Sequence, residues 1–388
     1  MGIINKILFS KTSGGSLSGY SSLYKKLYEA IIDNPEPEVL ALAPGLYQTG
    51  AIALYEEQGA EAIEGMMITS WDDLLANGTV HVDNGVVHTN YDNSTYPNAS
   101  SDALSGDLIL PNDGSITALG ALVYEGTWDD KAAFMACCSL TGVMIPDSVT
   151  TISDCAFYEC EALTHVAFGN NSQLETIGKC VFYYDPGLVS IDIPNSVVSI
   201  GEEAFAWCEN LKSVTLPNGL SVIEGYMFNG CTSLTSITLP DSVTAIGSYA
   251  FDDTAWLTLK RQENPLVIIN NILVDGTTCP GDVVIPDGIT SIVPGAFNWN
   301  ESLTSIVIPD SLTSIGFSTF SGCSSLTSVV IPDSVTTIEE YAFESCSSLT
   351  SITFKGTVEQ WNELAKGYCW NNGVPATYVQ CSDGQVAL

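Results

Sequence analysis

Apolar positions return at a constant interval through most of this chain. Between Ile308 and Phe354 an Ile-Pro-Asp-Ser segment, a Phe, a Cys and a Leu appear twice, the second copy twenty-three positions after the first. The same interval separates every matching pair of this stretch: Pro309 and Pro332, Phe320 and Phe343, Cys323 and Cys346, Leu326 and Leu349. A fixed period of this size is typical of a solenoid, in which each repeat forms one coil that stacks on its neighbours.

Each repeat is predicted to hold two short extended pieces and a turn. In residues 326–331 the apolar positions end in the alternation of a strand, with Val329 facing the interior. Pro332 lacks an N–H group and should end this strand. A second extended piece then brings Ile338 back to the interior, and residues 341–346 are expected to be short and helix-like.

The repeat is predicted to run from residue 106 to residue 354, with irregular places. Residues 258–284 fill one period with two β-branched runs around Asn270 and Asn271, which predicts a tight hairpin because Asn tolerates positive φ. Residues 355–388 are expected to form a C-terminal cap, in which Trp361 and Trp370 cover the last coil. The predicted fold is a mostly-β α/β solenoid of about ten coils, preceded by a small α+β module.

The recurring segments resemble the BspA-like leucine-rich repeat family. Ile-Pro-Asp-Ser-Val-Thr-x-Ile, Ala-Phe and Cys-x-x-Leu-Thr-Ser occur together from about residue 108 to the C-terminus, whereas roughly the first 105 residues show no such resemblance. The resemblance implies a surface-displayed adhesion or protein-binding module and not an enzyme. Thr254 and Asn300 depart from the pattern, since they stand where the repeat has Cys.

The N-terminal region differs from the repeats. Residues 1–34 are expected to form a basic amphipathic arm, with one apolar row and one tyrosine row on a helix. The residues expected to dock this arm are Lys6, Lys11, Tyr20, Leu23, Tyr24, Lys25, Lys26 and Leu27. Residues 45–105 are expected to form a small α+β module and linker. The arm either binds a partner, which is another copy or a scaffold protein, or it packs on the first coil as a cap.

Composition excludes several classes of function. The formal net charge is −34 although only 14% of residues are charged, which argues against nucleic-acid binding through phosphates. No apolar run approaches the roughly 20 residues that span a bilayer, and the apolar start of the chain is too short for a recognisable signal peptide. The family resemblance nevertheless implies an extracellular, surface-exposed protein. The alternative is a virion structural or decoration protein of a phage capsid or tail, whose arm docks to the particle and whose repeats face outward.

The cysteines and carboxylates do not predict a catalytic, cofactor or metal site. Five of the twelve cysteines share one repeat position and are expected to be small core residues with free thiols: Cys160, Cys208, Cys231, Cys323 and Cys346. The chain has no Cys-x-x-Cys pair and three histidines, which argues against zinc. The Asp that follows many of the repeat prolines is better explained as a solvated turn residue than as a calcium ligand.

The outward positions of the first strand of each repeat are the predicted partner-binding surface. This strand lane is rich in small hydroxyl residues, and its candidate contacts are Thr164, His165, Lys212, Ser213, Thr235, Ser236, Thr304, Thr327 and Thr350. The expected ligand is a protein or a cell-surface glycan. Because the lane lacks the Trp, Tyr and Arg of usual hot spots, binding is either weak and multivalent or made by irregular parts: Tyr183-Tyr184, residues 258–284 and the N-terminal module.

The arm can be tested by deleting residues 1–34. Its positive charge is concentrated in residues 6–26 of an otherwise acidic chain, so it should steer association with a partner. We expect the truncated protein to keep its circular dichroism spectrum but to lose assembly or display, as measured by light scattering. Unfolding on truncation would instead identify the arm as a cap, and no change in either property would contradict the docking role.

Overall fold

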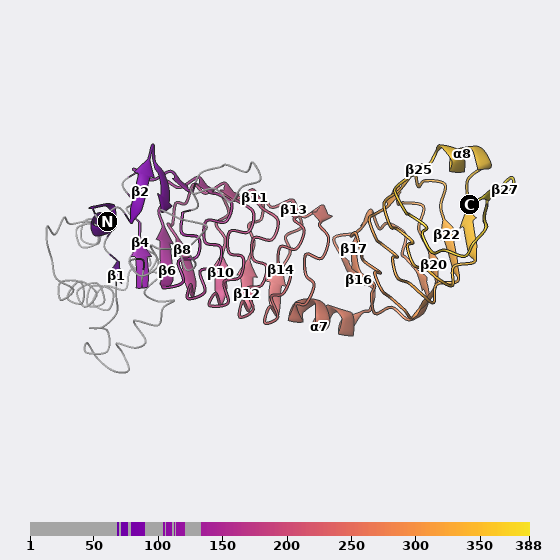
Figure 1. The fold of residues 1–388 in the computed structure, drawn as a ribbon, viewed down its shortest axis with the longest axis horizontal. Helices are drawn as coiled ribbons and strands as arrows, with labels where there is room; N and C mark the ends of the chain where they lie inside the picture. Colours follow the sequence, from indigo (N-terminus) through magenta and orange to yellow (C-terminus); the bar gives the residue numbers. More distant parts are fainter. Residues whose placement is uncertain are drawn as a thin grey trace. The chain divides into compact units, whose positions relative to one another are not determined.

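The computed structural model describes residues 68–69, 71–76, 79–89, 104, 106–110, 112, 114–120 and 133–388. The fold is a mostly-β solenoid of about ten turns, as the period predicts (Figure 1). Its residues form two compact units. The first reaches Leu220 and includes Met227–Pro240 and Asp253–Ala255; the second comprises Ser221–Tyr226, Asp241–Asp252 and Trp256–Leu388.

In the first unit, parallel strands form two sides of each coil. One side has two sheets, β1(Ile68–Thr69)-β4(Gly106–Ile109)-β6(Leu140–Ile145)-β8(His165–Phe168) and β10(Ser190–Asp192)-β12(Ser213–Thr215)-β14(Ser236–Thr238). The other side has one sheet, β11(Ser199–Ile200)-β9(Thr176–Ile177)-β7(Thr151–Ile152)-β5(Ala118–Leu119)-β3(Val86–Thr89)-β2(Val80–Asp83). Helix α6 (Trp71–Ala76) precedes the antiparallel β2–β3 pair. Since β1 pairs with β4 and β3 pairs with β5, residues 68–69 and 86–89 belong to the sheets of the solenoid.

The second unit repeats this plan. Its sheets are β13(Val222–Ile223)-β15(Ala245–Ile246), β16(Val267–Ile269)-β17(Ile272–Asp275)-β19(Ser291–Ile292), β18(Gly281–Val284)-β20(Leu303–Val307)-β22(Ser328–Ile331)-β24(Ser351–Phe354)-β26(Tyr378–Gln380)-β27(Gln385–Ala387), and β21(Ser314–Ile315)-β23(Thr337–Ile338)-β25(Ala365–Lys366). Register follows the sequence period, since Ser305 pairs with Ser328 and Ser328 pairs with Ser351.

The predicted strands and interior of the coil are confirmed. Strand β22 ends at Ile331, immediately before Pro332, and Val329 and Ile331 are buried while Ser328 and Val330 are partly exposed. Strand β23 places Ile338 in the interior. The alternation follows from the pleat, which sends successive side chains to opposite faces.

The expectation of a helix-like segment at residues 341–346 is wrong. Every second N–H group of this segment donates to a carbonyl of the next coil, and not to one in its own coil. In the equivalent turn of the preceding coil, Ser318, Phe320 and Gly322 donate their N–H groups to carbonyls of the next coil, at 2.8–3.1 Å. The N–H groups between them bond locally, so the segment is a chain of turns. Tyr341 and Ser345, at the same two repeat positions as Ser318 and Gly322, have φ of 57° and 59°, which no right-handed helix allows.

Phenylalanine rings fill the interior of the stack. In the first unit Phe134, Phe157, Phe182, Phe205 and Phe228 are fully buried and lie ring on ring, with centroids 5.3–5.6 Å apart. In the second unit Phe297, Phe320 and Phe343 do the same at 5.1 Å, and Trp370 closes the row edge-on. Trp361 packs against Phe354 and Trp370, so both cap tryptophans are buried over the last coil.

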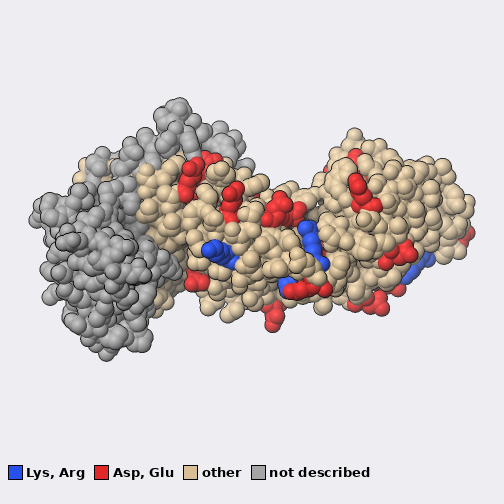
Figure 2. Space-filling view, turned by 90° about the horizontal axis from the view of Figure 1, so that it is seen from below, with Lys and Arg blue, Asp and Glu red and all other residues tan. Residues whose placement is uncertain are grey.

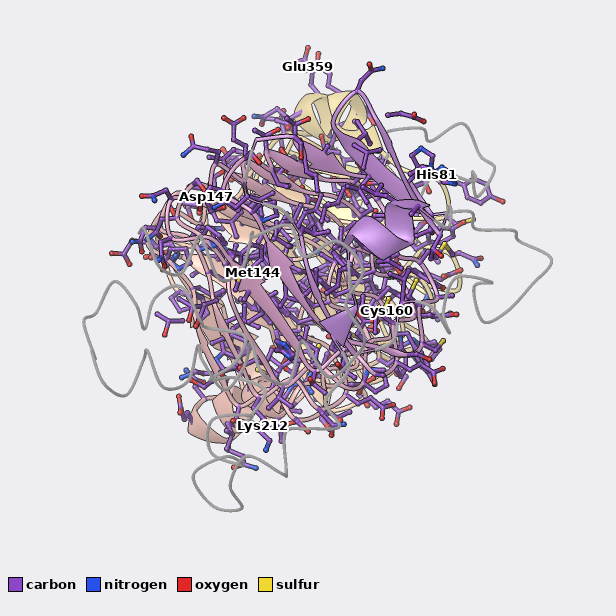
Figure 3. The ribbon with its side chains drawn as sticks, turned by 90° about the vertical axis from the view of Figure 1, so that its left-hand side faces the viewer. His81, Met144, Asp147, Cys160, Lys212 and Glu359 are labelled. Carbon is purple, nitrogen blue, oxygen red and sulfur yellow. The ribbon has the colours of Figure 1, made fainter. Side chains whose placement is uncertain are left out.

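The five repeat cysteines are buried and free, as predicted. Each thiol also donates a hydrogen bond to the Phe carbonyl of the preceding coil, for example Cys231 Sγ to Phe205 O at 3.0 Å and Cys346 Sγ to Phe320 O at 3.0 Å. Burial raises the pKa of the Cys231 thiol to about 12. Figure 3 shows Cys160 inside the coil cross-section, whereas Asp147 of a proline turn projects from its margin.

Polar residues replace the repeat Cys in three coils, at Asp185, Thr254 and Asn300. Two of them, Asn300 and Asp185, form hydrogen bonds between coils. Asn300 is buried and donates from Nδ2 to Gly276 O and Cys279 O, both at 2.8 Å. Asp185 is also fully buried, and its Oδ1 accepts the Cys160 N–H at 2.7 Å. Among the described residues, its Oδ2 has no hydrogen-bond partner. Burial, with Glu159 nearby, raises the pKa of the Asp185 carboxyl well above its usual range.

The irregular segment after residue 254 contains a helix and the predicted hairpin. Strands β16 and β17 are antiparallel, and Asn270 and Asn271 have φ of 49° and 61°, which confirms the Asn-Asn turn. Helix α7 (Ala255–Glu263) was not predicted; Trp256 from this helix packs against Phe251 at a centroid distance of 4.6 Å.

The Phe stack and the strand lane should differ strongly in their contribution to stability. We expect Phe228→Ala to lower the free energy of unfolding by about 3–5 kcal/mol, because it empties part of a close-packed interior. Thr235→Ala, on the exposed face of the same unit, should cost less than about 0.5 kcal/mol. Thermal unfolding measures both; equal shifts would contradict the assignment of faces.

Asp185→Asn should stabilise the protein at neutral pH. A carboxyl whose pKa is raised in the folded state holds its proton more tightly than in the unfolded chain. The protonated Asp185 carboxyl therefore contributes most to the free energy of unfolding below the unfolded pKa of about 3.9. This contribution is lost as the pH rises through the folded pKa. We expect a gain of about 1–3 kcal/mol at pH 7 that shrinks towards pH 4.

The matched control for this prediction is Asp241→Asn, which changes an exposed aspartate. Its stability difference from the unmodified protein should vary little over the same pH range. A gain for Asp185→Asn that does not depend on pH would show that the Asp185 carboxyl is not the titrating group.

Candidate binding surfaces

The strand lane is largely exposed, but the hydroxyl groups of Thr164, Thr304 and Thr327 bond to other coils. Thr164, Lys212, Thr235, Ser236, Thr327 and Thr350 are exposed, and Ser213 and Thr304 are half-buried. Thr327 Oγ1 donates to Thr304 O at 2.9 Å, and Thr304 Oγ1 donates to Asp282 Oδ1 at 2.8 Å. Hydroxyls already bonded across the coils have less capacity for a ligand.

His165 does not lie on the exposed lane, so the prediction that placed it there is wrong. Only 5% of its surface is exposed, and its Nδ1 lies 3.0 Å from Thr164 Oγ1. It pairs in register with Gly142, which has no side chain to compete for the space beside the imidazole. Ala167 of the same strand is buried as well.

The predicted docking residues of the N-terminal arm lie outside the described residues. This holds for Lys6, Lys11, Tyr20, Leu23, Tyr24, Lys25, Lys26 and Leu27. In the described part of the chain, no helix is both long and apolar enough to cross a membrane.

Exposed aromatic side chains gather on the turn side of the coils. In the first unit, Tyr184 and Trp207 take the same position in adjacent coils and are 41% and 39% exposed. Trp207 lies against the next coil at Gly230, where a Cβ would come within 2.8 Å of the indole. We call Tyr184 and Trp207 the aromatic patch of the first unit.

Trp299 of the second unit occupies the same repeat position as Trp207. Its indole lies over Gly322 of the next coil, where a Cβ would approach to 2.6 Å, and it is 67% exposed. Sequence reasoning singled out Tyr184 but missed both tryptophans. Their spacing could have identified them as residues at one repeat position, since Trp207 lies one period after Tyr184 and Trp299 lies four periods after Trp207.

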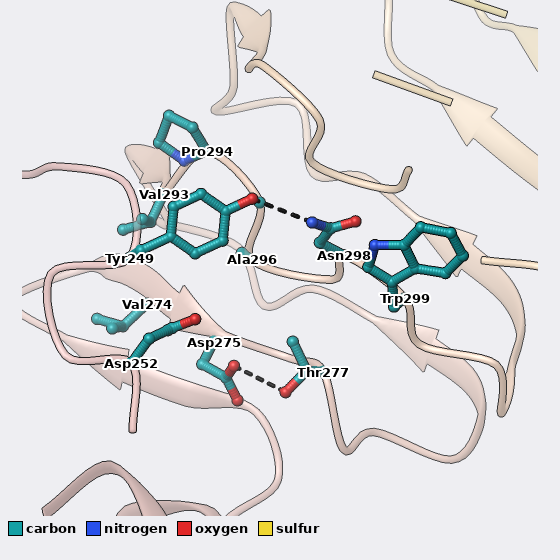
Figure 4. Close-up of a pocket in the computed structure, with 11 residues that line it drawn as sticks. Tyr249, Asp252, Val274, Asp275, Thr277, Val293, Pro294, Ala296, Asn298 and Trp299 are labelled. Carbon is teal, nitrogen blue, oxygen red and sulfur yellow. Dashed lines mark hydrogen bonds between the residues drawn. The ribbon is translucent and has the colours of Figure 1, made fainter. Parts of the chain in front are cut away.

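A small cavity adjoins Trp299 within the second unit. It measures about 200 Å³ and is lined by residues of three successive coils, among them Tyr249, Asp252, Thr277 and Asn298. Figure 4 shows Tyr249 and Asn298 on one side of the cavity and Asp275 and Thr277 on another, with Trp299 at its end. Arg261 holds Asp275 by two hydrogen bonds of 2.8 and 2.7 Å.

A wider hollow of about 470 Å³ lies in the first unit, beside the break between the β8 and β10 sheets. Its lining comes from residues 166–172 and from Asp192–Ser196. The break follows a lengthened coil, since the interval from Phe157 to Phe182 exceeds the period by two positions. The aromatic part of the lining is one half-buried ring, that of Phe168.

Charged side chains do not form a second kind of site in the described chain. Figure 2 shows Asp and Glu scattered over the face in view, with fewer Lys and Arg. Within the described residues, no three His, Cys, Asp or Glu side chains are grouped to hold a metal ion. The turn aspartates bond to other coils, as Asp310 does to Lys355 and Asp147 to the Asn171 N–H.

Comparison with known proteins identifies the repeats. The model for BspA type leucine-rich repeat regions matches six copies, over residues 130–258 and 275–372. The unmatched gap holds most of helix α7 and all of β16. No curated protein matches the chain.

The solved structures similar to this chain are also leucine-rich repeat proteins or antigens. A leucine-rich cell surface protein from Faecalibacterium prausnitzii is 24% identical, covering 74% of this chain and 95% of its own, with a TM-score of 0.38. A leucine-rich repeat protein from Bacteroides ovatus is 26% identical over 74% and 86%, with a TM-score of 0.39. The pneumococcal vaccine antigen PcpA is 19% identical over 78% and 82%, with a TM-score of 0.48.

Proposed function

Because the chain belongs to the BspA-type leucine-rich repeat family, we propose that it is a non-enzymatic, protein-binding adhesion solenoid displayed on a surface. Solenoids of this kind repeat one short unit to make an extended surface, and such surfaces commonly bind proteins. The carrier is a cell envelope or, as the alternative, a virus particle, to which residues 1–34 attach the solenoid.

The aromatic patch of the first unit is the observation that carries this proposal. Tyr and Trp are enriched at the energetic centres of protein interfaces because they bury large rigid surfaces. Tyr184 and Trp207 are exposed at adjacent positions of a scaffold that the stack holds rigid. The strand lane offers only small hydroxyl side chains, some of which, such as those of Thr304 and Thr327, already bond between coils. We therefore assign the strand lane to the rim of the contact and the aromatic patch to its centre.

Screening the full chain against immobilised cell-surface and extracellular-matrix proteins tests this assignment. We expect saturable binding to at least one protein, and a Tyr184→Ser/Trp207→Ser variant should lose about 30-fold or more in affinity, since a hot-spot residue contributes about 2 kcal/mol or more. Biolayer interferometry measures the change.

The lane supplies the matched control. Thr235→Ala/Ser236→Ala changes two exposed lane residues of the same unit and should alter the affinity by less than about threefold. The opposite ranking of the two variants would place recognition on the strand lane. Absence of saturable binding to every protein in the screen would contradict the proposed function.

A further inference from the structure

The cavity beside Trp299 exists because one coil has a shortened turn. Leu273 pairs with Ile292, and Val283 pairs with Ile306, yet the chain from Ile292 to Ile306 is four residues longer than the chain from Leu273 to Val283. The shortening removes a Phe from the interior row. The ring of Phe297 instead lies over Gly276, where a Cβ would come within 2.2 Å of it. The turn side is left with a hollow of about 200 Å³.

Trp299 offers this hollow a flat aromatic surface. One face of its indole lies on Gly322 of the following coil, and the other cavity residues belong to its own coil or to earlier ones. Trp299 stands at the end of the cavity in Figure 4, so a ligand seated there can reach the part of the indole that does not lie on Gly322. With 67% of its surface exposed, Trp299 has ample area to stack on a ligand.

Tyr249 borders the cavity with its hydroxyl and not with a free ring face. Its ring stacks on Tyr226 at 5.3 Å, and on another side it meets the backbone of Gly295, where a Cβ would lie 3.1–3.4 Å from its atoms. Its hydroxyl accepts a hydrogen bond from Asn298 Nδ2 at 3.0 Å, which fixes its position. The cavity thus has one aromatic platform and lacks the several ring faces of a cage for quaternary ammonium groups.

The remaining lining combines acceptors with hydroxyl groups. Asp252 contributes a carboxylate. The Tyr249 hydroxyl, which accepts from Asn298, can donate to a ligand, and the Thr277 hydroxyl can accept from one. Thr277 Oγ1 donates to Asp275 Oδ1 at 2.9 Å, and Arg261 compensates the Asp275 charge. Both contacts hold the polar side of the cavity in place before any ligand arrives.

We infer that this cavity binds a single pyranose ring of a neutral glycan. A pyranose has an apolar C–H face, which suits one indole, and a rim of hydroxyls that both donate and accept hydrogen bonds. The volume is below the roughly 300 Å³ at which sites for drug-sized ligands begin, so one ring fits and a larger molecule does not. The Asp252 carboxylate disfavours a phosphate or sulfate ligand by charge.

The test is titration calorimetry of the full chain with a panel of monosaccharides: glucose, galactose, mannose, fucose and N-acetylglucosamine. At least one should bind saturably in the millimolar range. Trp299→Ala should weaken that binding at least about tenfold, because it removes the platform while changing a mostly exposed side chain. Thr277→Val, which removes one hydroxyl, should weaken it to a smaller extent.

The matched control is Trp207→Ala, which removes a tryptophan at the same repeat position, also packed on a glycine, but not part of this cavity. Its sugar affinity should be unchanged. The inference does not rest on the proposed protein-binding function. Substituting Trp207 should lower only the affinity for a protein ligand, and substituting Trp299 should lower only the affinity for the sugar. No binding of any sugar, binding unaffected by Trp299→Ala, or preferential binding of choline at this site would each overturn it.

Discussion

A single coil of this solenoid has two open sides, and only the neighbouring coils can close them. Three kinds of contact do so: the stacked Phe rings, the alternate N–H groups of the turns, and the thiols that donate to the preceding Phe carbonyl. Each contact joins residues at equal or nearly equal repeat positions of adjacent coils: Phe to Phe, turn N–H to turn carbonyl, and Cys thiol to Phe carbonyl. A coil that changes length loses some of these contacts, which is why most coils keep the period that separates Pro309 from Pro332.

The same constraint explains which parts of the structure could be predicted. Strands and core residues follow from the sequence because pleat and period alone decide which side chains face inward. The Tyr341–Cys346 turn could not be predicted, since Ala-Phe-x-x-Cys also suits a helix and only the neighbouring coil decides where the N–H groups point. His165 was misplaced for a similar reason: its burial depends on its surroundings in the fold, including the facing Gly142, and not on its own position in the strand.

Stacking and recognition use different residues of the repeat. Several threonines of the lane have hydroxyls that reach a carbonyl or carboxylate of the adjacent coil, as Thr327 and Thr304 do, and such contacts favour threonine at this repeat position. A residue that recurs for this reason carries little information about a ligand. Tyr184, Trp207 and Trp299 occupy a position where other coils have Gly, Ala, Ser or an acidic residue, so the stack does not require an aromatic side chain there. Trp207 and Trp299 each pack on a glycine of the next coil but keep 39% and 67% of their surface exposed, and on this exposure we base their proposed part in binding.

The shortened turn shows how the fold tolerates a cavity. Strand pairing on both sides of that coil is preserved, because Leu273 and Val283 keep their partners Ile292 and Ile306. Hydrogen bonds then fasten the short turn: the buried Asn300 donates to the carbonyls of Gly276 and Cys279, and Arg261 holds the buried Asp275. A void left by truncating a core residue partly collapses and destabilises its surroundings. Here the walls are held by hydrogen bonds of their own, so the hollow beside Trp299 keeps its shape as part of the fold.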